Sequence, residues 1–339
     1  MSSDSTAESS APAAWLDEYL ALTAGAGLVD CTDRTQIELT GDDRAKFLHN
    51  LCTQEVRKLD SLAGGEAFLL DVKGHILSHG FIFSLGDSLV WETVAGESEK
   101  LLKHFDRYLV REKVVLADRG AVWGSWLVAG PRAAEMLAHV VESGSLQSLH
   151  DLSMYSSIAA KIADRDVWMH RVPLVGPDGY FVSARRDDLA AVRDAMLAAG
   201  VTACGAAAFH AARIEAGSPL YGVDVSEKNL PQEVARDAQA LNFKKGCYLG
   251  QETVARIDAL GHVNRRLVGV RFEGNAIPPR GTALKAGEQA AGEVTSSAWS
   301  PRLNAPLALA YVRREHPAPG AELTSDTGRG ALVTLPVRD

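Results

Sequence analysis

The pattern of the chain changes near Gly261, and this change constrains the fold more than any other feature. Before it, segments with apolar residues at helical spacing alternate with short runs typical of strands. After it, short strand-like runs are separated by turns that contain Gly and Pro. The chain has 339 residues, 46% of them apolar, which is enough for more than one hydrophobic core. The pattern predicts an α+β body followed by a small all-β domain.

Individual segments of the body show the alternation. Residues 36–40 alternate polar and apolar side chains, as a half-buried strand does. Residues 67–70 and 80–83 predict the two arms of a hairpin. Residues 205–216 predict a short helix. Strands and helices therefore succeed one another along the whole body.

The charge and the N-terminal segment limit the partners. The net charge is −8, and a grip on a nucleic-acid backbone that ignores sequence needs an excess of Lys and Arg. Residues 1–14 are rich in Ser and Ala and lack the basic start and apolar core of a signal peptide, so they predict a disordered tail. No apolar run approaches the roughly 20 residues of a membrane span. We expect a cytoplasmic protein that contacts neither nucleic acid nor membrane directly.

The cysteines are too widely spaced for a disulfide framework or a closed zinc site, because no CxxC pair occurs. They are Cys31, Cys52, Cys204 and Cys247. Free thiols in a reducing compartment are the simplest interpretation, and we predict no metal site.

Cys247 has unusual neighbours. It lies between Gly246 and Gly250 and follows Lys244 and Lys245. A free thiol with a pKa near 8.5 is only about 3% thiolate at neutral pH, and nearby ammonium groups raise that fraction. The alternative is a buried, inert cysteine in a tight turn. The residues alone leave both interpretations open.

A second candidate is Glu215, in the segment Arg213-Ile-Glu-Ala-Gly217. A partly buried glutamate can accept two parallel hydrogen bonds from an amidine-like edge, such as the 2-amino group and N3–H of a pterin. Charge-assisted bonds of this kind contribute about 1.5–3 kcal/mol each. The alternative is an Arg–Glu pair on a helix surface, which contributes little.

The segment Lys245-Gly-Cys-Tyr-Leu-Gly-Gln-Glu252, continued by residues 263–270, resembles the motif of YgfZ-type folate-binding proteins. It is also similar to the aminomethyltransferase T-protein of glycine cleavage, in which the cysteine position carries another residue. The resemblance extends from about Leu28 to the C-terminus. Its other pieces are residues 40–42, 44–48, 71–74, 176–180, 213–217, 230–233, 292–296 and 300–301.

This resemblance implies a three-domain cloverleaf around a central folate pocket, with two ferredoxin-like α+β domains and a C-terminal β-barrel. The expected first domain is discontinuous, formed by residues 15–65 and 150–260. Residues 66–149 are expected to form the second α+β domain, and residues 261–339 the barrel.

The resemblance also implies site residues. Tetrahydrofolate is the expected cofactor, with Glu215 at its pterin and Cys247 as the reactive thiol. Lys245 is expected to act beside Cys247. The remaining expected cofactor-binding residues are Arg213, Tyr248 and Gln251.

One departure from the T-protein pattern bears on activity. In T-proteins the segment that resembles Lys73–Leu77 continues into a pair of aspartates, one of which serves acid–base chemistry. Here Ser78 and His79 stand in those positions, and serine does not titrate near neutral pH. A second departure is Phe181, where T-proteins tend to place an acidic residue. Both argue against the glycine-cleavage reaction and leave open whether the chain is an enzyme.

The YgfZ-type motif favours a folate-dependent factor that supports assembly or repair of iron–sulfur enzymes, including those that modify tRNA. Its partners would be iron–sulfur client enzymes, through which any effect on tRNA would be exerted. One alternative is a tetrahydrofolate-dependent aminomethyltransferase or demethylase that uses His79 or a distant acid. Another is an interaction scaffold that binds no folate.

Overall fold

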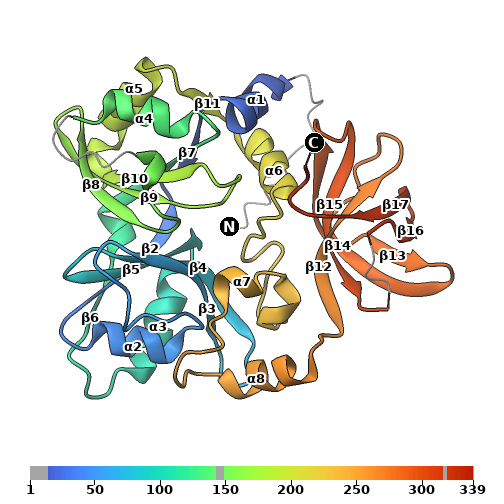
Figure 1. Ribbon diagram of the computed structural model, residues 1–339, viewed down its shortest axis with the longest axis horizontal. Helices are drawn as coiled ribbons and strands as arrows, with labels where there is room; N and C mark the ends of the chain where they lie inside the picture. Colours follow the sequence, from blue (N-terminus) through green and yellow to red (C-terminus); the bar gives the residue numbers. More distant parts are fainter. Residues whose placement is uncertain (1–13, 143–148, 316–318, 339) are drawn as a thin grey trace.

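The computed structural model describes residues 14–142, 149–315 and 319–338. Three sheets, each with its own hydrophobic core, surround the centre of the molecule (Figure 1). Apart from Ala14, the predicted N-terminal tail lies outside the described residues.

The first sheet, at the lower left of Figure 1, is antiparallel with the order β3-β4-β5-β2-β6. Its strands are β2 (Arg34–Thr40), β3 (Gly64–Leu70), β4 (Ile76–Ser84), β5 (Ser88–Ala95) and β6 (Val115–Asp118). The helices α2 (Arg44–Leu51) and α3 (Ser98–Tyr108) bury Phe47, Leu101 and Phe105 against it. The predicted hairpin is confirmed, since Ala67 pairs with Gly80.

The second sheet, at the upper left of Figure 1, has the order β11-β1-β7-β10-β9-β8. Its strands are β1 (Gly27–Cys31), β7 (Trp123–Ala129), β8 (Ser157–Ile162), β9 (Arg165–Arg171), β10 (Gly179–Arg185) and β11 (Thr202–Cys204). Successive residues of β7 face opposite sides, as a strand requires. Val128 packs in the core that holds α4 (Ala133–Val140) and α5 (Leu189–Ala198). Leu127 packs in the core that holds α1 (Leu16–Ala24) and α6 (Ala206–Glu215).

The membership of these sheets differs from the predicted division at two strands. β2 pairs with β5 and β6, although residues 15–65 were expected to belong with residues 150–260. β7 pairs with β1 and β10, although residues 66–149 were expected to form a separate domain. Both differences arise because a strand joins the sheet that offers it partners, and these partners are distant in the sequence. The domain limits as such stay a prediction.

The C-terminal strands form a closed barrel with the order β12-β15-β14-β13-β16-β17. They are β12 (Arg265–Phe272), β13 (Ala283–Ala286), β14 (Gln289–Ser300), β15 (Ala305–Arg313), β16 (Glu322–Ser325) and β17 (Gly328–Val333). Val270, Leu284 and Ala308 are among the side chains that fill it. The predicted α+β fold with a C-terminal β-barrel is therefore confirmed.

A long connection joins α6 to the barrel. It contains a 3₁₀ turn (Pro231–Val234), α7 (Asp237–Ala240) and α8 (Gln251–Leu260). α7 packs against β3 near the centre of the molecule, and α8 lies at its lower edge in Figure 1. Cys247 is in the loop between these two helices. None of the helices in the described ranges is long and apolar enough to span a bilayer.

Candidate functional site

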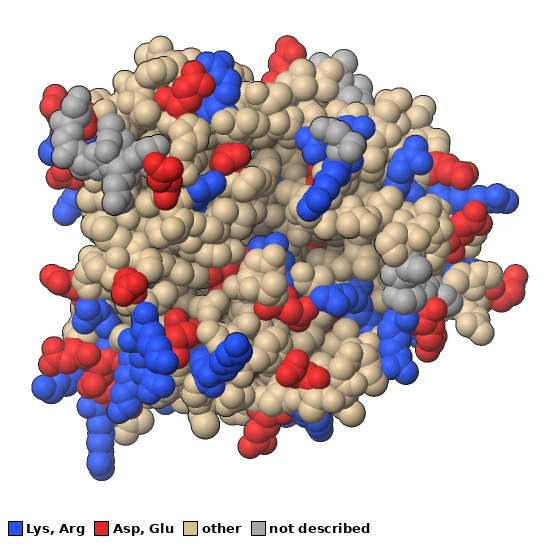
Figure 2. Space-filling model, viewed as in Figure 1, with Lys and Arg blue, Asp and Glu red and all other residues tan. Residues whose placement is uncertain are grey.

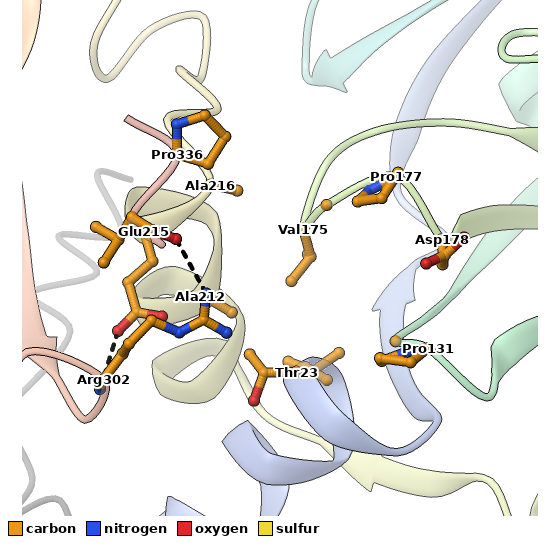
Figure 3. Close-up of a pocket in the computed structure, with 14 residues that line it drawn as sticks. Thr23, Pro131, Val175, Pro177, Asp178, Ala212, Glu215, Ala216, Arg302 and Pro336 are labelled. Atoms are coloured by element: carbon orange, nitrogen blue, oxygen red, sulfur yellow. Dashed lines mark hydrogen bonds between the residues drawn. The ribbon is translucent and has the colours of Figure 1, made fainter. Parts of the chain in front are cut away.

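A hollow of about 200 Å³ lies between the second sheet and the barrel. Figure 3 shows Glu215 and Arg302 on one side of it and Val175, Pro177 and Asp178 on the other. We call it the first hollow. Figure 2 shows the molecule hollowed at its centre, with acidic and basic side chains interspersed over this face.

A second hollow of about 390 Å³ lies beside the first, and Ala216 and Pro336 line both. Its polar lining includes Arg236, Gln239 and Arg266. The two hollows together follow the inner edge of the barrel from α6 to α7. This arrangement gives room for a ligand that is longer than a single ring system.

Glu215, the last residue of α6, is 4% exposed and lines the first hollow. The Tyr19 hydroxyl donates to Oε2 at 2.6 Å, the Ser300 hydroxyl donates to Oε1, and the Arg302 amide lies 3.4 Å from Oε1. Burial, reinforced by the Glu215 carboxylate, raises the pKa of Tyr19 far above its ordinary value, so this phenol stays a donor. A carboxylate offers about four lone-pair positions, two on each oxygen, and the two hydroxyls occupy one on each oxygen. The Arg302 amide is close to the 3.5 Å limit of a hydrogen bond, so one position on Oε2 is open and the second position on Oε1 is only weakly occupied. Its placement fits the predicted pterin contact.

Arg213, two residues earlier on α6, has a different environment. It is fully buried, and its Nη1 donates to Asp224 Oδ2 at 2.6 Å. Asp224 Oδ1 also accepts from the hydroxyls of Thr295 and Ser296 on β14, at 2.6 Å each. Burial alone would raise the pKa of Asp224, but Arg213 and these hydrogen bonds lower it below its ordinary value. Through Asp224 these contacts join α6 to the barrel. Arg213 is not among the described residues that line the two hollows, and its predicted cofactor contact stays a prediction.

A buried charge network at the centre of the molecule has no signal in the sequence. Glu66 on β3 is 1% exposed and accepts from Arg236 Nε at 2.7 Å, from His79 Nε2 at 2.8 Å and from the Tyr155 hydroxyl at 3.0 Å. Burial acts to raise the pKa of Glu66, but Arg236 and His79 lower it far below its ordinary value. His79, which the alternative activity would use, is therefore tied to a carboxylate. Ser78 beside it is fully buried.

Lys245 is also buried, and its ammonium donates to three main-chain carbonyls. These are the carbonyls of His49 (2.6 Å), Cys52 (2.7 Å) and Gln54 (2.9 Å). The first belongs to the last turn of α2, where a cation is favourable and carbonyls lack helical partners. Burial lowers the pKa of Lys245 to about 8, so the ammonium persists at neutral pH. These contacts hold the loop in place. The catalytic role of Lys245 stays a prediction.

The other predicted residues of this loop lie apart from the first and second hollows. Cys247 is exposed, which removes the alternative of a buried, inert cysteine. Tyr248 is buried, and Lys245 Nζ lies 4.7 Å from the centre of its ring. Gln251 begins α8. None of these three residues is among the described residues that line the two hollows, and their predicted roles stay predictions.

The remaining thiols are buried. Burial raises the pKa of Cys31 to about 12 and that of Cys204 to about 11, and it also raises the pKa of Cys52. Cys247 is thus the accessible thiol of the chain. Within the part of the chain that the structure describes, no group of three or more His, Cys, Asp or Glu side chains is arranged to hold a metal ion.

Comparison with known protein families agrees with this architecture. The family described as the GCVT N-terminal domain matches residues 4–240, and the glycine cleavage T-protein C-terminal barrel domain matches residues 265–338. The chain belongs to the aminomethyltransferase superfamily. This places both the α+β body and the barrel in one known arrangement.

Individual members of the superfamily are similar over most of their length. An aminomethyltransferase from Symbiobacterium thermophilum is 28% identical over 317 residues, which cover 91% of this chain and 84% of that protein. An aminomethyltransferase from Streptomyces avermitilis is 28% identical over 94% of this chain and 88% of that protein. The crystal structure of the glycine cleavage system aminomethyltransferase T from Bartonella henselae superposes with a TM-score of 0.84, at 20% identity over 95% of this chain and 88% of that one. The last comparison establishes the shared fold.

These superfamily members bear on the competing predictions. The relatives named above are aminomethyltransferases, which supports the predicted alternative activity better than the role in iron–sulfur assembly. They leave the YgfZ-type subfamily and the assignment of each site residue as predictions.

Proposed function

We propose that the chain binds tetrahydrofolate in the first hollow, with Glu215 as the anchor for the pterin. The observation that supports this most directly is a buried carboxylate that faces a cavity and is held by donors from Tyr19 and Ser300. These donors fix the direction of the carboxylate, which is needed to receive the 2-amino group and N3–H together. The superfamily's use of tetrahydrofolate points to the same ligand.

Calorimetric titration with tetrahydrofolate, under reducing anaerobic conditions, tests this proposal. We expect saturable binding by the wild type and a loss of more than about 100-fold in affinity for Glu215→Ala, because two charge-assisted hydrogen bonds contribute about 3–6 kcal/mol together. Glu135→Ala, which removes an exposed carboxylate of α4, is the control and should bind like the wild type. A wild type that does not bind would favour the scaffold without folate.

The reaction that best fits the superfamily is the transfer of a one-carbon unit to or from tetrahydrofolate, as an aminomethyltransferase or demethylase. The names of the relatives support it. His79, paired with Glu66, is the candidate acid–base group in place of the missing aspartate. The assay is formation of methylene-tetrahydrofolate from an aminomethyl donor by the purified protein. No product under conditions where the folate binds would exclude this reaction.

The second candidate is a YgfZ-type role, in which Cys247 supports assembly or repair of iron–sulfur client enzymes, including those that modify tRNA. One observation favours it: the thiol in the Lys245–Glu252 motif is exposed while the other three are buried. The test is complementation of a deletion strain. This role predicts that Cys247→Ser fails to restore iron–sulfur enzyme activity, and full restoration would rule it out.

A further inference from the structure

The wall of the first hollow that lies opposite Glu215 is formed by the loop between β9 and β10. Val175, Pro177 and Asp178 of this loop line the hollow across from Glu215 and Arg302 (Figure 3). Among the described residues that line the hollow, only Asp178 and Glu215 are acidic. The hollow therefore has one carboxylate on each of two opposite walls.

Arg171, the last residue of β9, fixes the loop that carries Asp178. Its Nε donates to the carbonyl of Pro177 at 3.1 Å, and its Nη1 donates to the carbonyl of Leu152 at 2.7 Å. Its Nη2 donates to Asp178 Oδ1 at 3.2 Å. The main chain is held as well, since the Gly130 amide donates to the carbonyl of Asp178 at 3.0 Å. Both the backbone and the side chain of Asp178 are thus anchored.

One oxygen of Asp178 is left for a ligand. Arg171 engages Oδ1, whereas Oδ2 has no hydrogen-bond partner among the described residues. The side chain is 38% exposed, so a ligand in the hollow has access to it. Because an ionised carboxylate only accepts hydrogen bonds, Oδ2 favours an N–H group of a ligand and disfavours a ligand atom with a lone pair.

The two halves of a pterin present different groups to these two carboxylates. The 2-amino group and N3–H are the same in folate, dihydrofolate and tetrahydrofolate, so the contact at Glu215 does not distinguish the oxidation states. The other ring does: N5 and N8 both carry hydrogen in tetrahydrofolate, only N8 does in dihydrofolate, and neither does in folate. A pterin with its 2-amino edge at Glu215 directs the ring with N5 and N8 toward the opposite wall, where Asp178 lies.

We propose that Asp178 selects reduced folates by accepting a hydrogen bond at Oδ2 from N5–H or N8–H of the ring. Arg171 is the positioning residue that holds this carboxylate in place. In folate the same nitrogen would present a lone pair to the carboxylate, and a site built to accept from an N–H group rejects a ligand that lacks it. This inference rests on the proposed binding of tetrahydrofolate in the first hollow and assigns the residue that recognises its oxidation state.

The test is calorimetric titration of the whole protein with tetrahydrofolate, dihydrofolate and folate, under reducing anaerobic conditions. We expect the wild type to bind tetrahydrofolate at least about tenfold more tightly than folate, as one charge-assisted hydrogen bond provides. Asp178→Asn should reduce this preference to less than about threefold, because an amide can both accept and donate. Glu215→Ala should weaken both ligands by the same factor and keep the preference. The matched control is Asp166→Asn on β9, which removes an exposed carboxylate paired with Lys161 and should bind like the wild type.

Dihydrofolate identifies the nitrogen. If Oδ2 accepts from N8–H, dihydrofolate should bind like tetrahydrofolate. If it accepts from N5–H, dihydrofolate should bind like folate. Both results support the selection by Asp178, provided that Asp178→Asn removes the difference.

Two further variants keep the proposal testable if Asp178→Asn does not fold. Asp178→Ser withdraws the acceptor from the ring and should lose the preference in the same way. Arg171→Gln should narrow the preference several-fold, because the carboxylate is no longer held. A purely structural role of Arg171 would instead weaken tetrahydrofolate and folate equally.

Two results would overturn the inference alone: a wild type that binds tetrahydrofolate and folate equally well, or an Asp178→Asn variant that keeps the wild-type preference. A wild type that binds none of the three folates would overturn the proposed function, and this inference with it. The two failures are therefore distinguishable in the same experiment.

Discussion

Helix α6 and the loop before α8 each place a charged residue two positions before a residue of the proposed function. Arg213 precedes Glu215 on α6, and Lys245 precedes Cys247 in the loop. In both segments the cation is buried and paired within the protein, with Asp224 in one case and with three carbonyls in the other. The residue that follows is the one left available to a ligand or reagent.

The two segments differ in what surrounds the available residue. Glu215 is buried and held by donors from Tyr19 and Ser300 at the wall of a hollow. Cys247 is exposed on a loop, with an unpartnered ring nitrogen of His49 behind the neighbouring Gly246. Recognition of a ligand edge needs a desolvated carboxylate of fixed direction, whereas a reactive thiol needs access to its reagent. Substitutions at one site should therefore leave the other unchanged.

The largest expected effect is the loss of stability when the buried ion pair between Arg213 on α6 and Asp224 is broken. Arg213→Met should lower the free energy of unfolding by about 3–5 kcal/mol, because it leaves Asp224 buried without its partner. Urea denaturation measures this. The control is Arg132→Met, which breaks an exposed pair with Glu135 and should cost less than about 1 kcal/mol. Equal losses in the two variants would show that the buried pair contributes no more than a surface contact.

A smaller loss of stability is expected for a substitution in the loop before α8. Lys245→Met should lower the free energy of unfolding by about 2–3 kcal/mol, because buried carbonyls such as that of Cys52 lose their donor. Lys244→Met removes the exposed neighbouring lysine and should change stability by less than about 0.5 kcal/mol. Affinity for tetrahydrofolate should stay at the wild-type value in both. A folate affinity that falls in Lys245→Met alone would mean that the two sites are coupled.

The smallest expected effect is on tetrahydrofolate affinity, and it tests whether the folate site and Cys247 respond independently. Tyr19→Phe should weaken tetrahydrofolate binding about fivefold, since one hydrogen bond that directs Glu215 is worth about 1 kcal/mol. The rate at which iodoacetamide alkylates the exposed Cys247 should not change. Tyr108→Phe, on α3 and away from both hollows, is the control for calorimetry. Wild-type affinity in Tyr19→Phe would contradict the orienting role of this hydroxyl.

Much of the local structure follows from side-chain patterns. The hairpin of β3 and β4, helix α6 and the strands of the barrel agree with the sequence-based expectation, because spacing of apolar residues depends on which side chains face a core. The placement of β2 and β7 in their sheets does not agree with that expectation, since strand pairing joins residues far apart in the chain.

The candidate site residues also show what the sequence indicates and what it leaves out. Residue type and local motif made Glu215 and Cys247 candidates, and the family resemblance implied the pterin contact and the reactive thiol. The same resemblance implied roles for Arg213 and Lys245, which stay predictions. The sequence showed these two charges without showing that each is buried against a partner within the protein.

The sequence by itself determined the alternation of elements, the change to an all-β domain near Gly261 and the chemistry available at Glu215 and Cys247. Only the tertiary structure decided that Glu66 meets Arg236, and that His49 with Glu55 lies behind the loop of the thiol. The physical reason is that burial and pairing of charges depend on segments brought together by folding. No local pattern of residues encodes which charge will be the partner of which.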